Sequence, residues 1–175
     1  MKPGITLIDD FLDDHEILFQ DLSESVQWDD RMAARRTASF SEPYNYSQMT
    51  YPAAAIPSAL SSVIELLRER LGITFNNCLL NFYKTGDNRM GFHSDDTTNL
   101  VRGTGVAILS LGNPRSITYR SKADKAVQHS FVLRPGSLLY MDSLVQEHWL
   151  HGIRKQKDAG PRISLTWRAF NTTGD

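Results

Sequence analysis

The sequence has little of three things that mark special classes of protein: cysteine, long apolar runs and net charge. Its single cysteine, Cys78, excludes a disulfide framework and a zinc finger built on several thiolates. No stretch reaches the roughly 20 apolar residues of a membrane helix. Asp9 and Asp10 interrupt the first apolar run before it reaches signal-peptide length. We therefore expect a soluble, cytoplasmic protein without a membrane partner.

The remaining composition is that of an ordinary globular chain. Of the 175 residues, 41% are hydrophobic and 22% are charged, which excludes a disordered chain. This length suits one domain with a sizeable core. We expect a single domain over residues 1–175 that acts as a monomer.

The net charge of −1 hides an uneven distribution. Residues 1–30 carry nine acids against one base, a net charge of −8, whereas the other 145 residues carry 18 bases against 11 acids, a net charge of +7. An acidic helix beside an otherwise ordinary surface is the interpretation that composition alone favours. A basic working face is the alternative, so the small net charge does not exclude a polyanionic partner.

Hydrophobic spacing predicts helices in the N-terminal part and strands after it. Apolar residues recur at helical spacing between Asp14 and Val26, and again between Pro57 and Gly72. Residues 29–56 between them are polar and predicted to be loop-rich or hairpin-like. Short apolar runs bounded by turn-like stretches follow, at residues 78–83, 105–111, 116–119, 130–133, 137–141 and 163–170. The sequence thus predicts an α+β fold, a jelly roll (double-stranded β-helix) over residues 78–170 flanked by N-terminal helices.

The triplet His93-Ser94-Asp95 is a candidate metal site. On an extended segment, residues i and i+2 point to the same side, so both side chains can reach one ion. A lone triplet is weak, but a later segment carries two further histidines, His148 and His151. Two imidazoles and one carboxylate form the facial triad that binds Fe(II) and leaves positions open for a cosubstrate and oxygen. Zinc accepts the same ligands.

Two arginines, Arg162 and Arg168, lie an even number of residues apart on the last predicted strand, so their side chains point to the same face. They can therefore face one cavity, and arginine suits bidentate binding of a carboxylate. Solvated charges on a surface strand are the alternative. Together with the triad, inward arginines fit an iron enzyme that also holds a dicarboxylate.

In order and spacing, these segments resemble the Fe(II)- and 2-oxoglutarate-dependent oxygenases of the AlkB type. The resemblance covers roughly residues 33–170 and is carried by Asn81-Phe82-Tyr83, His93-Ser94-Asp95, Leu150-His151-Gly152-Ile153 and Arg162-Ile163-Ser164-Leu165-Thr166-Trp167-Arg168. It implies a dioxygenase that uses Fe(II), 2-oxoglutarate and O2. The implied activity is oxidative demethylation (dealkylation repair) of N-alkylated bases in DNA or RNA, with release of succinate, CO2 and formaldehyde.

The resemblance also implies roles for single residues. The iron ligands are His93, Asp95 and His151, since Gly152-Ile153 and the spacing to Arg162 match the family better after His151 than after His148. Arg162 holds the distal carboxylate of 2-oxoglutarate, and Arg168 lies near its iron-side carboxylate. Asn81 and Tyr83 hydrogen-bond the cosubstrate. Ser164 stands where the family often has asparagine and can still donate one hydrogen bond.

Residues 30–56 resemble the lid that binds the substrate base in this family. Tyr44, Tyr46 and Arg36 fall where the family places substrate contacts, although the tyrosines can equally pack against the core. Basic residues that could contact phosphates are Arg35, Arg36, Arg89, Arg102, Arg154, Lys155 and Lys157.

One position departs from the family. Repair members usually carry an acid two residues after the iron-binding aspartate, where it recognises a cationic alkylated base. This chain has the neutral Thr97 there. Thr97 favours an alternative substrate, in which the chain hydroxylates a small molecule or a peptide. A non-catalytic jelly-roll binding module is the third alternative, which the triad and arginines disfavour.

Overall fold

A computed structural model describes residues 2–41, 44–46 and 49–172, with no side-chain detail for residues 42–51. The helices are α1 (His15–Ser25), the 3-10 turn η1 (Ser58–Leu60), α2 (Ser61–Leu71) and α3 (Ser143–His148). The strands are β1 (Ile5–Ile8), β2 (Arg36–Ser41), β3 (Tyr44–Tyr46), β4 (Met49–Tyr51), β5 (Asn77–Tyr83), β6 (Met90–His93), β7 (Val106–Gly112), β8 (Arg115–Ser121), β9 (Gln128–Leu133), β10 (Leu138–Met141), β11 (Trp149–Ile153) and β12 (Arg162–Arg168). None of the helices in these ranges has the length and apolar character needed to cross a bilayer.

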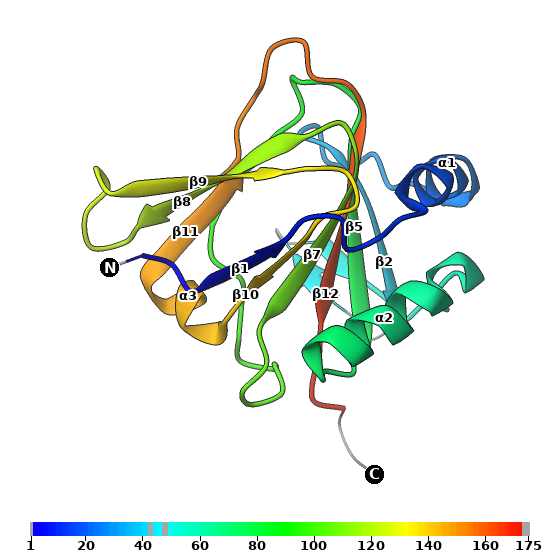
Figure 1. Cartoon of the computed structure of the whole chain (residues 1–175), viewed down its shortest axis with the longest axis horizontal. Coiled ribbons are helices and arrows are strands. Elements are labelled where there is room, and N and C mark those ends of the chain that lie inside the picture. The colour runs from blue at the N-terminus through cyan, green and yellow to red at the C-terminus, as the bar shows by residue number, and fades with distance from the viewer. Residues whose placement is uncertain (1, 42–43, 47–48, 173–175) are drawn as a thin grey trace.

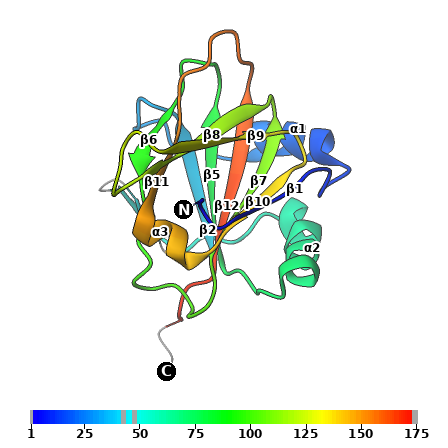
Figure 2. The same cartoon turned by 60° about the vertical axis from the view of Figure 1, so that its left-hand side comes forward.

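Two antiparallel sheets form the body of the molecule (Figure 1). The major sheet has the order β1-β10-β7-β12-β5-β2, and the minor sheet has the order β6-β11-β8-β9. Figure 2 shows the minor sheet lying across one face of the major sheet. A separate hairpin joins β3 to β4. The predicted jelly roll is therefore confirmed.

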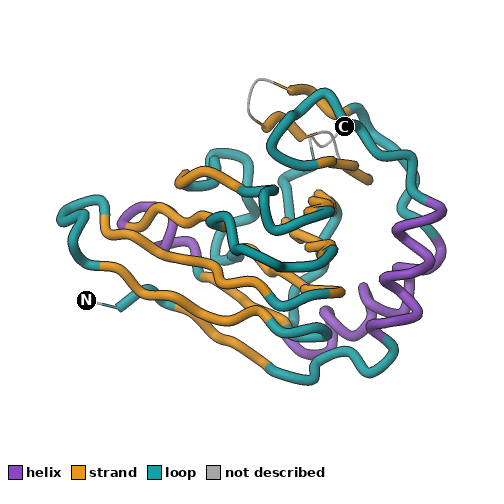
Figure 3. The backbone as a smooth tube through the Cα atoms, turned by 90° about the horizontal axis from the view of Figure 1, so that it is seen from above, coloured by secondary structure: helices purple, strands orange, loops and turns teal. Residues whose placement is uncertain are grey.

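The alternation of side chains along β5 and β12 assigns each residue to one of two layers. On β5, Cys78 and Leu80 pack in a core with α1 and α2, whereas Leu79 and Tyr83 pack between the sheets. Seen from above, the two longer helices lie at one side of the layered strands (Figure 3). Inward-facing polar residues of the major sheet are thereby directed toward the minor sheet.

Both predicted N-terminal helices are present. Leu18 and Leu22 are the buried residues of α1, and Val63 and Leu67 are those of α2. Gly72 ends α2 in the left-handed conformation (φ 66°), where a residue without a Cβ is favoured. Spacing thus predicted the buried residues of both helices, except that Ile17, also part of the predicted apolar face of α1, is 69% exposed.

The prediction for residues 29–56 was incomplete. A hairpin is present there, but β2 is also a full strand of the major sheet, paired with β5 from Arg36↔Phe82 to Ser41↔Asn77. Its sequence RTASFS lacks a continuous apolar run because one edge of the sheet buries small and polar side chains. The strands β6 and β11, which carry the histidines, also gave no clear apolar signal.

Candidate active site

Two neighbouring strands of the minor sheet present His93 and His151 side by side. The strands β6 and β11 pair antiparallel, with His93 directly opposite His151. The two imidazole centroids lie 4.5 Å apart, and His93 Nδ1 lies 2.9 Å from the Gly91 carbonyl oxygen. The backbone contact holds the His93 ring so that its Nε2 points away from the strand.

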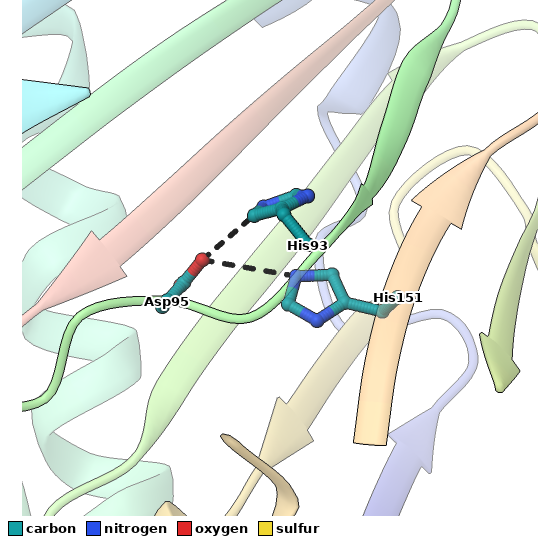
Figure 4. A group of neighbouring side chains, drawn as sticks. All are labelled: His93, Asp95 and His151. Carbon is teal, nitrogen blue, oxygen red and sulfur yellow. Dashed lines mark ion pairs between the residues drawn. The ribbon is translucent and has the colours of Figure 1, made fainter. Parts of the chain in front are cut away.

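Asp95 completes the cluster from the loop after β6 (Figure 4). The triplet is therefore not carried by one strand, as the period-of-two prediction assumed: β6 ends at His93. Asp95 Oδ1 lies 3.3 Å from His93 Nε2 and 3.8 Å from His151 Nε2. The backbone N–H of Asp95 donates a 2.8 Å hydrogen bond to Gln146 Oε1 on α3, which fixes the loop.

The three side chains have the geometry of a metal site. One ligand atom from each lies within 4.8 Å of the others. Two atoms bonded to the same ion at roughly 2.1 Å are separated by at most about 4.2 Å, so the Asp95–histidine distances already fit. Asp95 Oδ1 is buried yet accepts no well-formed hydrogen bond. A divalent cation would satisfy this orphaned oxygen.

The charges of the cluster also suit a metal ion. Burial alone would raise the pKa of Asp95, but the Arg168 guanidinium, with His93 and His151, holds that pKa well below its usual range. Burial lowers the pKa of His151 to about 4, against the opposing pull of Asp95. At neutral pH the pair therefore offers a carboxylate and a neutral imidazole, the forms that bind metals.

Arg168, at the end of β12, is hydrogen-bonded to the Asp95 carboxylate through the oxygen Oδ2, which faces away from the histidines. Its Nη2 donates to Asp95 Oδ2 at 2.7 Å, and both side chains are almost fully buried. One oxygen of Asp95 is thus occupied by Arg168, and the other is left facing the histidines. This contact orients the carboxylate.

Within the described part of the chain, Arg162 at the start of β12 has no carboxylate partner. Its Nη2 donates to Ser110 Oγ at 2.9 Å, while its Nε and Nη1 are buried and make no well-formed hydrogen bond. The guanidinium carbon lies 5.2 Å from the ring centroid of Tyr83, its neighbour on β5. Burial lowers the pKa of Arg162 to about 10, with Tyr83 opposing, so the group stays charged at neutral pH. Such a cation is a binding site for an anion.

Asn81 and Ser164 lie between these two ends, opposite one another on β5 and β12. Both are buried, and Asn81 Oδ1 accepts a 2.7 Å hydrogen bond from Arg35 Nε. A small cavity of about 20 Å³ lies at the metal end and is lined by Arg35, Leu79, Asn81, Met90, His93, Asp95, Ile108, His151, Thr166 and Arg168. Asn81 and Arg168 line this cavity, and Arg162 and Ser164 lie on the same face of β12 as Arg168.

Other predicted residues do not join this cluster. His148 ends α3 with its side chain 57% exposed, 4.0 Å from Glu147. Arg36 is half-buried on β2, and Thr97 is exposed in the loop after Asp95. The side chains of Tyr44 and Tyr46 lie outside the part of the chain that the structure describes in full. Their predicted contacts with a base stay predictions.

Two site residues were missed or misread. Arg35 was predicted as a phosphate contact, but its side chain is buried and bonded to Asn81. Gln146 was not predicted at all, although it is buried and holds the Asp95 backbone. Both contacts join residues about 50 positions apart, so no local pattern could have signalled them.

Comparison with known proteins agrees with this geometry. The family model of the 2OG-Fe(II) oxygenase superfamily matches residues 5–168. DNA oxidative demethylase ALKBH2 of Homo sapiens is 32% identical over 142 residues, which cover 74% of this chain and 53% of that protein. Alpha-ketoglutarate-dependent dioxygenase alkB homolog 3 of Homo sapiens is 28% identical over 171 residues, 86% of this chain and 60% of that protein.

A solved structure of OsALKBH1 superposes with a TM-score of 0.69 at 18% identity, over 96% of this chain and 99% of that one, which supports the fold alone. The chain spans about half to three fifths of the length of the curated relatives described above. The sequence matches and the residues of the site carry the family assignment. This chain belongs to the 2-oxoglutarate- and Fe(II)-dependent oxygenase superfamily, and within it to the AlkB type.

Proposed function

We propose that this chain is an Fe(II)- and 2-oxoglutarate-dependent oxygenase that oxidatively demethylates N-alkylated bases in DNA or RNA. The observation that carries the proposal is the pairing of two complementary ends in one inter-sheet region. One end holds the cluster of His93, Asp95 and His151, and the other holds the buried, uncompensated Arg162. A metal ion and a dicarboxylate would satisfy both.

In this proposal, His93, Asp95 and His151 hold the iron. Bound iron supplies the activation of O2 for oxidation of a C–H bond, while 2-oxoglutarate is converted to succinate and CO2. The Nε and Nη1 groups of Arg162 hold the distal carboxylate of 2-oxoglutarate, beside Tyr83. Between the two ends, the Asn81 amide and the Ser164 hydroxyl would hydrogen-bond the cosubstrate. The surrounding apolar residues would exclude water.

The relatives support a nucleic-acid substrate, because one of them is named a DNA oxidative demethylase. The charge distribution is compatible with this, since the chain after residue 30 carries a net charge of +7. A lid with Tyr44 and Tyr46 would stack a base that has been taken out of the helix. This role of the lid remains part of the proposal.

A cationic cluster on the outer face of the minor sheet supports contact with phosphates. Arg120 on β8 lies 4.1 Å from the ring centroid of Phe92, and Arg154 lies 5.3 Å from the same ring. Phe92 directly precedes the metal-cluster residue His93. The two guanidiniums lie on the outer face of the minor sheet, because their neighbours Tyr119 and Ile153 face the space between the sheets. A backbone phosphate of a bound strand would be attracted to that outer face.

The test is to incubate the protein with Fe(II), 2-oxoglutarate and methylated oligonucleotides, and to measure succinate and formaldehyde together. Equal amounts of both, dependent on the oligonucleotide, are expected. The variant His151→Ala should form neither, whereas His148→Ala, at an exposed site on α3, should behave as wild type. Succinate without formaldehyde would contradict the nucleic-acid substrate and favour hydroxylation of a small molecule or a peptide. The absence of succinate with every substrate offered would contradict the oxygenase itself.

Two organisational features belong to the same proposal. We expect residues 1–175 to act as one domain and as a monomer, with residues 30–56 as the lid. Size-exclusion chromatography with light scattering measures the mass directly. A stable dimer would contradict the monomer without affecting the proposed chemistry.

A further inference from the structure

The Arg162 end of the active site is closed by two loops that are continuous with its own residues. The first loop, residues 84–89, continues from Tyr83 at the end of β5, and the second, residues 154–161, leads into Arg162 at the start of β12. The loops lie side by side at one end of the sheets (Figure 1), where a backbone hydrogen bond of 2.9 Å joins them. Together they form the cover of this end. A contact that holds the cover together therefore also fixes the position of Tyr83 and Arg162.

One buried side chain, Arg115, binds both loops of the cover. Its Nη2 donates to the carbonyl oxygens of Asn88 (2.9 Å) and Arg154 (2.6 Å), and its Nη1 donates to that of Thr85 (3.4 Å). Thr85 and Asn88 belong to the first loop, and Arg154 begins the second. A planar guanidinium with several fixed donors can join the two loops in this way, whereas a compact ammonium group cannot.

Arg115 approaches the Arg162 end from the minor sheet. It begins β8 and shares a face of that strand with Ile117 and Tyr119, which pack between the sheets. The ring centroid of Tyr83 lies 5.5 Å from the guanidinium carbon of Arg115 and 5.2 Å from that of Arg162. These three side chains are each 1% exposed, although most residues of the two loops are exposed. The cover therefore keeps water away from the Arg162 end.

The cover is tightly packed. A Cβ added at Gly86 would lie 1.8 Å from the carbonyl oxygen of Gln156, so a larger residue fits there only if one loop moves. The turn that precedes Arg115 is attached as well, because Asn113 N–H donates a 2.8 Å hydrogen bond to the carbonyl oxygen of Pro161 at the end of the second loop. Three segments of the chain thus meet at this end, and Arg115 begins at one of them and binds the other two.

We propose that Arg115 is a positioning residue for the cosubstrate, which holds the cover closed so that Arg162 binds the distal carboxylate of 2-oxoglutarate away from water. This inference rests on the proposed function and adds to it a residue that acts through Arg162. Two charges attract about four times more strongly at an effective dielectric constant of about 20 than in water at about 80. Opening the cover therefore weakens the attraction for the distal carboxylate and leaves the metal end unchanged.

Binding of two keto acids to the Mn(II)-loaded protein tests this role. 2-Oxoglutarate and 2-oxobutyrate share the metal-binding end, and only the first has a distal carboxylate, so the ratio of their dissociation constants reports on the Arg162 end. Arg115→Lys keeps the positive charge but cannot reach all three carbonyl oxygens. A tenfold preference for 2-oxoglutarate should fall to about twofold. Unchanged affinity for 2-oxobutyrate shows that the variant is folded.

Further variants separate closure of the cover from charge. Gly86→Ala pushes the loops apart without altering any charge and should lower the preference as Arg115→Lys does. Asp87→Asn is the matched control, because it removes only an exposed ion pair (3.6 Å) between Lys155 and Asp87 on the same two loops, and it should leave the preference unchanged. In an Arg162→Met background, Arg115→Lys should not change the affinity for 2-oxoglutarate, since Arg115 acts through Arg162.

The outcomes distinguish this inference from the proposed function. A preference retained in folded Arg115→Lys or in Gly86→Ala would overturn the inference and leave the proposed function standing. If Arg115→Lys binds neither acid, a preference lost in Gly86→Ala but kept in Asp87→Asn still supports the cover, whereas a preference kept in both overturns it. If the wild-type protein binds both acids equally, the cosubstrate assignment of Arg162 fails and the inference fails with it.

Discussion

The two ends of the active site differ in how their charges are balanced. At the metal end, Asp95 is paired with Arg168 at 2.7 Å and faces two histidines. At the other end, the equally buried Arg162 donates to the hydroxyl of Ser110 and lies against Tyr83, and none of its partners among the described residues is a carboxylate. The first end is organised by the protein alone, whereas the second is left incomplete until an anion binds. The difference distinguishes a site built for a cation from one built for a carboxylate.

Loss of a metal ligand should have the largest effect. His151→Ala is expected to reduce Mn(II) or Fe(II) affinity by more than about 100-fold, because altering groups that merely support a ligand costs 10–100-fold. Succinate formation should disappear with it. The exposed His148→Ala is the matched control, with unchanged affinity by calorimetric titration. Equal losses in both variants would contradict the assignment of the ligands.

Replacing each arginine by methionine should separate the two ends by the sign of the stability change. Arg168→Met leaves the buried Asp95 carboxylate unpaired and should lower the free energy of unfolding by about 3–5 kcal/mol in the metal-free protein. Arg162→Met removes an uncompensated buried charge and should leave that free energy unchanged or raise it. Urea unfolding at pH 7 without 2-oxoglutarate measures both. Similar destabilisation by both variants would remove the distinction between the ends.

The stability of the metal-free protein should also depend on pH through His151. The unfolded chain takes up this proton near pH 6.5, whereas the native protein does so only near its pKa of about 4. The unfolded state therefore binds more protons in that interval, and the free energy of unfolding should fall by about 3 kcal/mol as pH is lowered from 6.5 to 4. Asp95 adds a further loss at lower pH, since its pKa is also depressed.

Unfolding curves at several pH values give the free energy of unfolding as a function of pH. This free energy should depend less steeply on pH in His151→Gln than in the wild-type protein, and equally steeply in His148→Gln. An unchanged slope in His151→Gln would show that other groups cause the pH dependence.

Gln146 should have the smallest effect, acting as a positioning residue through the backbone of Asp95. Gln146→Met keeps the length of the side chain but leaves the Asp95 N–H without its acceptor. We expect metal affinity to fall by about tenfold. The neighbouring exposed Glu147→Met is the control on the same helix. Unchanged Mn(II) affinity in Gln146→Met would mean that the loop is held by other contacts.

The elements best predicted from sequence are those whose packing is local and periodic. Helix α1 and helix α2 follow a repeated apolar face, and β5, β7 and β12 are continuous apolar or alternating runs. The strands β6 and β11 are short, and each includes a glycine, Gly91 or Gly152. Their pairing brings residues 93 and 151 together across the intervening strands β7 to β10 and helix α3, which no local pattern encodes.

The sequence predicted the chemical groups of the site more completely than their arrangement in space. The residue types and spacing of His93, Asp95, His151 and Arg162 pointed to a metal and a dicarboxylate before any contact was known. The position of Asp95 outside the strand was not predictable, because a triplet fits both an extended strand and a strand end. The roles of Arg35 and Gln146 depend on tertiary contacts and required the structure.

Binding of two keto acids to the Mn(II)-loaded protein tests the central claim most directly. 2-Oxoglutarate and 2-oxobutyrate share the metal-binding keto-acid end, but only the first carries a distal carboxylate. The wild-type protein should bind 2-oxoglutarate at least about tenfold more tightly, which corresponds to one charge-assisted contact with Arg162, and Arg162→Met should bind both acids equally. Equal affinities in the wild-type protein would contradict the assignment of the Arg162 end as the carboxylate site.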